Sequence, residues 1–112
     1  MKAQQEIGQI TIAPEVLETV IRLATLAVPG VRHMITPPGV WRFLGRDGVK
    51  IEVDDNTVHT DVYIVIEPNA NMLAVGRQIQ AEVTRAIHDM IGMNVGSVDV
   101  HIEDVSRAVE AA

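Results

Sequence analysis

The sequence predicts an α+β fold: a two-layer sandwich of order β-α-β-β-α-β, in which two helices cover one face of a mostly antiparallel sheet. Apolar residues alternate with polar ones in four short segments and repeat at helical spacing in two others, and Pro, Gly or Asn separates the segments. Each helix has one apolar face, so packing both helices on the same side of the sheet buries every apolar face. The other sheet face is then open.

The chain has 112 residues, and we expect a single domain over residues 1–112, with a loop at 34–48 and a short tail at 106–112. Hydrophobic residues make up 47% of the chain and charged ones 21%, as in globular proteins. The absence of Cys fits a reducing compartment. No secretory signal and no apolar run of about 20 residues is present. We therefore expect a cytoplasmic protein without a transmembrane segment.

The first segment is a strand ending at Ala13, because Ile10 and Ile12 alternate with polar residues. A helix follows, since Pro14 suits the first helical position and Pro29-Gly30 stops the pattern. The apolar stripe of this helix consists of Val16, Leu17, Val20, Ile21, Leu23 and Ala24.

Alternation returns in a second strand, whose apolar face holds Val49, Ile51 and Val53. Asp55-Asn56 can supply the positive φ angles of a two-residue hairpin turn. The third strand is expected to bury Val58, Thr60, Val62, Ile64 and Ile66, and to turn outward His59, Asp61, Tyr63 and Val65.

A second helix is predicted from an Asn cap at 69 or 71 to Gly92, with an apolar stripe of Met72, Val75, Ile79, Val83, Ile87 and Met90. Gly76 inside this helix costs roughly 1 kcal/mol relative to Ala, so we expect it to permit close packing. The last strand buries Val98, Val100 and Ile102 and turns outward Asp99, His101 and Glu103.

Composition and motifs argue against catalysis and against nucleic acid. The net charge is −6 and the pI about 5.0, which repels phosphate backbones, although a basic segment runs from Arg32 to Lys50. The glycines at 45 and 48 lack the spacing of a phosphate loop and fit a tight turn. Neither Ser97 nor Ser106 lies in a nucleophile elbow. We expect no enzyme, no catalytic residue, no cofactor and no nucleic-acid partner.

One polar group could hold a metal ion. His59 with Asp61, and His101 with Asp99 and Glu103, are all predicted on the open sheet face. Imidazole and carboxylate groups could bind a divalent metal if the last two strands were neighbours. Alternating strands place polar residues outward in any case, so we expect no metal site.

The loop holds two of the three aromatic residues, Trp41 and Phe43, beside Arg42 and Arg46. These side chains either fold back over the core or form an exposed anchor. Trp and Arg are enriched in interface anchors and also suit an anionic membrane surface. We predict that these four residues bind a partner.

Five sequence blocks carry a family resemblance: residues 8–17 (GQITIAPEVL), 28–31 (VPGV), 48–53 (GVKIEV), 62–67 (VYIVIE) and 98–102 (VDVHI). Together they resemble the alkaline-shock family of Gls24-type envelope stress response proteins. The resemblance implies a cytoplasmic bacterial protein of the envelope stress response. In some members a partner holds the protein near the membrane, and other members are associated with fatty-acid metabolism. It implies no catalytic residue.

Our leading hypothesis is a non-enzymatic protein-interaction domain in cell-envelope homeostasis, with self-association and with protein partners that include a membrane-anchoring protein. One alternative is a regulator associated with fatty-acid metabolism. A second is a small RNA-binding α+β domain, which the acidic balance opposes. A third is a small metal-dependent enzyme built on His59 and His101.

Overall fold

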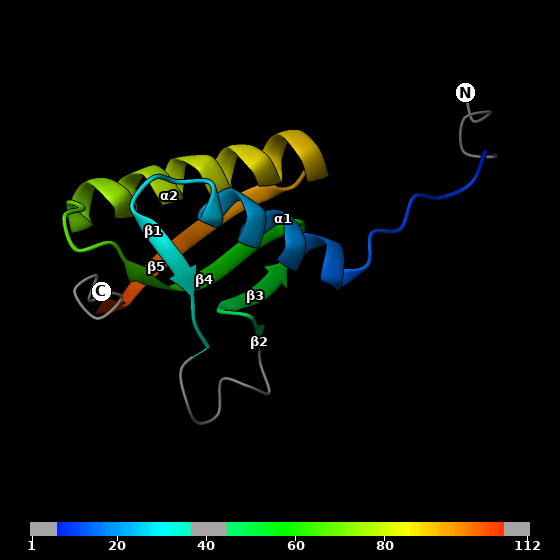
Figure 1. The fold of residues 1–112 in the computed structure, drawn as a ribbon. Coiled ribbons are helices and arrows are strands. Elements are labelled where there is room, and N and C mark those ends of the chain that lie inside the picture. The colour runs from blue at the N-terminus through cyan, green and yellow to red at the C-terminus, as the bar shows by residue number, and fades with distance from the viewer. Residues whose placement is uncertain (1–6, 37–44, 107–112) are drawn as a thin grey trace.

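The computed structural model describes residues 7–36 and 45–106 of the chain. The elements follow in the order α1 (Pro14–Leu26), β1 (Val31–Met34), β2 (Gly45–Arg46), β3 (Val49–Asp54), β4 (Thr57–Ile66), α2 (Met72–Ala86), the π-helical turn η3 (Ile87–Ile91) and β5 (Asn94–Val105). Both helices lie on the same face of the sheet (Figure 1). The predicted α+β sandwich with two helices on one face is confirmed.

Strand β4 is the centre of the sheet. Along one edge it pairs in parallel with β5 over its whole length. Its other edge pairs antiparallel with β3 through Val62 and then with β1, so that β3 and β1 lie end to end along it. Strand β2 forms an antiparallel hairpin with β3. The sheet is therefore mostly antiparallel, as predicted, and α2 supplies the long crossover that the parallel pair β4 and β5 requires.

Tyr63 marks the point on β4 where β3 gives way to the segment of β1. Its N–H donates to the carbonyl of Gly48 at 2.9 Å, and its carbonyl accepts from the N–H of Ile35 at 3.0 Å. Asp47 and Gly48 form the turn between β2 and β3 with positive φ angles of 52° and 81°. This is the tight turn that the sequence predicts there, with the φ angles that two-residue hairpins favour.

The second hairpin turn, between β3 and β4, also follows the sequence prediction. Asp55 and Asn56 have φ angles of 52° and 64°, and Asp54 pairs with Thr57 across the turn. Asn and Asp tolerate this left-handed conformation better than most residues because their short side chains bond the local backbone. The turn fixes the register that sends alternate residues of β4 toward the helices.

The core lies between the sheet and the two helices. Each residue predicted to face inward on β4 is fully buried, at 0% exposure: Val58, Thr60, Val62, Ile64 and Ile66. Helix α2 and the turn after it contribute Val75, Ile79, Val83 and Ile87. The buried hydroxyl of Thr60 donates to the carbonyl of Lys50 at 2.8 Å, so this polar group costs the core little.

The helix boundaries follow the sequence signals. Pro14 opens α1, the side chain of Asn71 accepts a hydrogen bond from the N–H of Ala74 at 2.9 Å, and Gly92 ends η3 with a φ of 82°. The buried stripe of α1 is narrower than predicted, because Val16 is 46% exposed and Leu23 is 59% exposed.

The strand predicted to end at Ala13 is wrong. Residues 8–13 belong to no helix or strand, and Figure 1 shows them leading away from the start of α1. Ile10, predicted to face a core, is 94% exposed. A period of two shows that one face of a segment is suited to burial, but it does not show which surface covers that face. We call residues 7–13 the N-terminal arm.

No helix in the described part of the chain combines the length and the apolar character needed to cross a bilayer.

Candidate functional site

The sheet face turned away from the helices is built by β3, β4 and β5, and we call it the open sheet face. Pairing places its side chains in cross-strand rows, one of which is Glu52, His59 and Ser97 and the next Lys50, Asp61 and Asp99. With Asp54, these residues line a shallow hollow of about 330 Å³. The polar row predicted from the sequence is thus brought together, and carboxylates outnumber cations in it.

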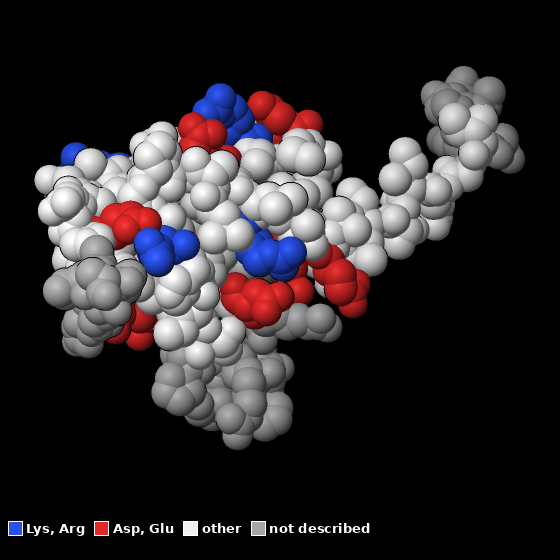
Figure 2. Space-filling model, in the orientation of Figure 1, with Lys and Arg blue, Asp and Glu red and all other residues white. Residues whose placement is uncertain are grey.

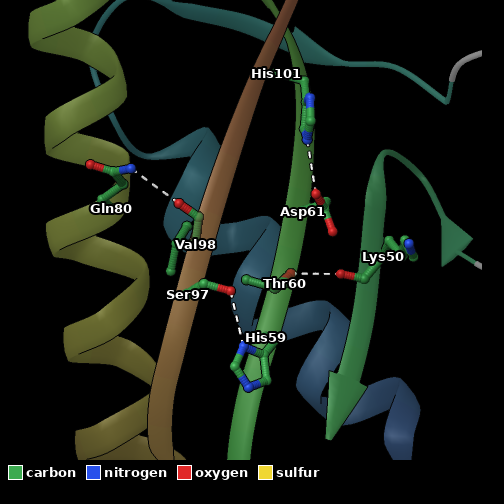
Figure 3. Close-up of polar contacts among 8 residues, drawn as sticks. All are labelled: Lys50, His59, Thr60, Asp61, Gln80, Ser97, Val98 and His101. Carbon is green, nitrogen blue, oxygen red and sulfur yellow. Dashed lines mark hydrogen bonds and ion pairs between the residues drawn. The ribbon is translucent and has the colours of Figure 1, made fainter.

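A hydroxyl partner holds His59 in place. Its Nδ1 lies 3.0 Å from the Oγ of Ser97 on the neighbouring strand (Figure 3). Between these strands the register shifts, because Val58 pairs with Val95 and His59 with Ser97, so that Gly96 is the extra residue of a bulge. A side chain at Gly96 would collide with the His59 ring. The bulge and its glycine therefore make room for the imidazole.

A carboxylate and an aromatic ring hold His101. Its Nε2 lies 2.8 Å from Oδ1 of Asp61, as Figure 3 shows, and its ring stacks on Tyr63 with centroids 4.4 Å apart and planes 12° apart. The two histidines thus have separate partners. Residues 7–36 and 45–106 contain no group of three or more His, Cys, Asp or Glu placed to hold a metal ion. The expectation of no metal site stays a prediction.

Tyr63 is buried although it faces outward, with 5% of its surface exposed. Burial raises the pKa of its phenol above the ordinary 10.0, and the nearby carboxylates of Asp61, Glu103 and Asp99 raise it further. Desolvation and negative neighbours both oppose the phenolate. The electrostatic character of this part of the open sheet face is therefore negative.

Because Tyr63 is the single tyrosine of the chain, the absorbance of phenolate reports on it alone. We expect a titration midpoint above 10.0 in the folded protein, and a lower midpoint in Asp99→Asn, which removes one repelling carboxylate. The protonated phenol of Tyr63 contributes fully to the stability of the folded protein at pH values below its pKa in the unfolded chain. This contribution is lost as the pH rises through the higher pKa of the folded state. Glu52→Gln is the control, since Glu52 is not among the causes of the shift. A wild-type midpoint at or below 10.0 would contradict a raised pKa of Tyr63.

The residues predicted to bind a partner are not tested by the structure. Trp41, Arg42 and Phe43 lie outside the described residues. Arg46 lies in β2, where its backbone pairs with Val49.

Sequence reasoning missed a groove between α2 and β5, which we call the α2–β5 groove. It has a volume of about 430 Å³ and is lined by Met72, Leu73, Gly76, Arg77, Gln80, Val100 and Ile102. Met72 is 48% exposed and Leu73 is 62% exposed, so apolar surface on α2 faces water beside the sheet edge. The sequence signal that could have indicated the groove is Gly76, a glycine in the middle of a helix.

A protein-family model matches residues 2–107 of the chain: that of the alkaline shock protein 23 family, described as having a cell envelope-related function. The uncharacterized protein Spy1535 of Streptococcus pyogenes is 31% identical over 104 residues, which cover 88% of this chain and 80% of the relative. The uncharacterized protein YqhY of Bacillus subtilis is 28% identical over 111 residues, which cover 94% of this chain and 82% of the relative.

Solved structures of the MamM CTD share the fold. Its manganese form has a TM-score of 0.52 and 20% sequence identity, over 80% of this chain and 96% of that one. A zinc form has a TM-score of 0.52 and 19% identity, over 84% of this chain and 88% of that one. At this level of identity the likeness concerns the arrangement of helices and strands alone.

Proposed function

The chain belongs to the alkaline-shock family, whose function is related to the cell envelope, and on that premise we propose that it is a non-enzymatic protein-interaction domain that associates with itself. The observation that carries the proposal is the amount of large apolar surface left in water. Ile10 is 94% exposed, Met90 is 71% exposed and Leu73 is 62% exposed. Exposed apolar side chains that gather in one patch, as Met72 and Leu73 do in the α2–β5 groove, mark sites of association in a small domain.

The open sheet face supports the same proposal. Its histidines are held by Ser97, Asp61 and Tyr63, so their side chains are fixed before any partner arrives. Fixed side chains lower the entropy lost on binding. The excess of carboxylates favours a basic protein surface and disfavours phosphate backbones, so we propose protein partners and no nucleic acid.

We further propose that the protein works in the cytoplasm in the envelope stress response, and that a membrane-anchoring partner holds it near the envelope. We propose that the loop at 34–48 selects the partner, through Trp41, Arg42, Phe43 and Arg46. An aromatic and cationic sequence in an otherwise acidic chain is suited to anchoring an interface.

Self-association is the part of this proposal that one measurement decides. Light scattering at about 100 μM, where weak association is populated, is expected to give a mass above the 12.2 kDa of one chain. Dilution should lower the average mass, since association follows mass action. A constant mass of one chain between about 10 and 200 μM would refute the proposal.

A further inference from the structure

The N-terminal arm has the sequence of a half-buried strand, but the described part of the chain covers only its last apolar side chain in part, since Ile12 is 43% exposed beside Ile51 and Ile91. Ile7 is 86% exposed and Ile10 is 94% exposed. Residues 7–13 carry no charge, and Figure 2 shows the arm free of acidic and basic side chains. An uncharged alternating segment in water is ready to pair with the exposed edge of a sheet.

The outer edge of β5 is such an edge. The side chain of Gln80 donates from Nε2 to the carbonyl of Val98 at 3.1 Å (Figure 3), so the backbone of Val98 faces away from β4. Successive residues of a strand point their N–H and C=O groups to opposite edges, so Val100 and Ile102 face the same way as Val98. In the described part of the chain, β5 pairs with β4 alone.

Gly76 lies in the α2–β5 groove. A Cβ added to this glycine would meet no heavy atom within 4 Å, so the predicted close packing within the chain is wrong. A glycine inside a helix still costs roughly 1 kcal/mol relative to Ala. Because no side chain in residues 7–36 and 45–106 approaches Gly76, the space above it is open to another group.

We propose that the arm of a second copy of this chain pairs as an added strand with the outer edge of β5. Ile10 and Ile12 of the arm enter the α2–β5 groove over Val100 and Ile102, below the open space at Gly76. The alternate arm residues then face the side of the sheet that carries Asp99, His101 and Glu103. These residues are Gln9 and Thr11, whose uncharged polar groups can donate to carboxylates.

The arm of the same chain cannot reach this groove. Pro14, at the base of the arm, lines a hollow with Ile91, at the far end of the α2 and η3 segment. Helical rise places Gly76 roughly 22 Å from that end. Ile12 precedes Pro14 by two residues and Ile10 by four, so their extended reach is about 7 and 14 Å. An arm that occupies this groove must therefore come from another copy of the chain.

The inference rests on the self-association proposed above, and paired substitutions in the arm test it. Ile10→Lys is expected to weaken self-association by roughly tenfold or more, the loss that follows when one isoleucine stays in water. Thr11→Lys is the matched control: it adds the same charge one residue away, on the side that meets carboxylates, and should leave association unchanged or strengthen it. Both sites lie on the exposed arm, so neither substitution should alter thermal unfolding of the monomer. Equal effects of the two substitutions would contradict the proposal.

A substitution in the groove separates blocked association from loss of fold. Gly76→Leu fills the open space, so it should weaken self-association. Because Leu is a better helix former than Gly, the same change should raise the melting temperature of the domain, by roughly 4–8 °C. Unchanged association with this variant would count against the α2–β5 groove as the acceptor.

Cross-linking identifies the two surfaces directly, because the chain has no native Cys. Copies carrying Ile10→Cys are mixed with differently tagged copies carrying Gly76→Cys and oxidised, and a disulfide between the two tags is expected. Leu23→Cys, in the groove between α1 and α2, is the control acceptor. Preferential bonding to the control overturns the inference. If the wild-type protein associates and Ile10→Lys associates equally well, the arm is not the contact, and the proposed self-association still stands. If the wild-type protein is a monomer, both the arm contact and the proposed self-association are refuted.

Discussion

Replacing Gly48 with Ala is expected to lower the free energy of unfolding by about 2–4 kcal/mol, the combined cost of a strained backbone and an overpacked contact. Gly48 has a φ of 81°. An added Cβ would lie 2.8 Å from the carbonyl oxygen of Ile35 and 3.0 Å from that of Tyr63. Both are backbone atoms of the junction where β1 and β3 meet along β4, so neither can rotate away.

The matched control is Gly92→Ala. Gly92 has nearly the same φ, 82°, but a Cβ there would meet nothing within 4 Å. Its substitution should cost only the left-handed backbone energy, about 1–2 kcal/mol. Urea unfolding of both variants at one pH measures the difference. If both variants lose the same free energy of unfolding, the backbone around Gly48 shifts to accept the added Cβ. The junction of β1 and β3 would then be less rigid than its hydrogen bonds indicate.

Truncating Ile64 to Ala is expected to cost about 2–5 kcal/mol, the range for removing a fully buried isoleucine and leaving a cavity. Ile64 has 0% exposure and pairs in register with Ile102 on β5 and with Met34 on β1. It therefore lies where three strands meet under the helices. Neighbouring side chains are anchored on separate elements, so collapse around the cavity is limited.

Val53→Ala provides the comparison for Ile64→Ala. Val53 lies on the adjacent strand β3 and is 52% exposed, so its truncation should cost less than about 1 kcal/mol. Denaturant unfolding with an unchanged slope would show that both changes act on stability rather than on the denatured state. If Ile64→Ala costs no more than Val53→Ala, the centre of β4 is not the core of this domain.

Much of the fold follows from local patterns. The inward residues of β4 were predicted individually because a long strict alternation leaves one choice of buried face. The turns at Asp47-Gly48 and Asp55-Asn56, and the end of η3 at Gly92, follow from residues that tolerate positive φ. These features are determined within a few residues, which is the range over which sequence patterns are informative.

Features that depend on distant segments were not predictable in the same way. Strand β1 is only four residues long, and it forms because β3 stops before the end of β4 and leaves an edge unpaired. The alternation of Ile10 and Ile12 is genuine, but the described part of the chain covers Ile12 only in part and leaves Ile10 in water. On the open sheet face, the sequence placed the polar residues correctly. It could not show that His59 bonds Ser97 or that His101 stacks on Tyr63, because those pairs depend on the register of β5.

The arm and the α2–β5 groove lie at opposite ends of the helical layer, and this separation governs how large an assembly can become. A copy that receives an arm in its groove keeps its own arm available, so addition does not stop at two molecules. Contacts of this head-to-tail kind give a closed ring if the rotation per step completes a turn, and an open filament otherwise. In a filament, a copy whose groove is filled by Gly76→Leu can donate its arm but accept none. Such copies would act as chain terminators, so their ratio to wild-type molecules would set filament length.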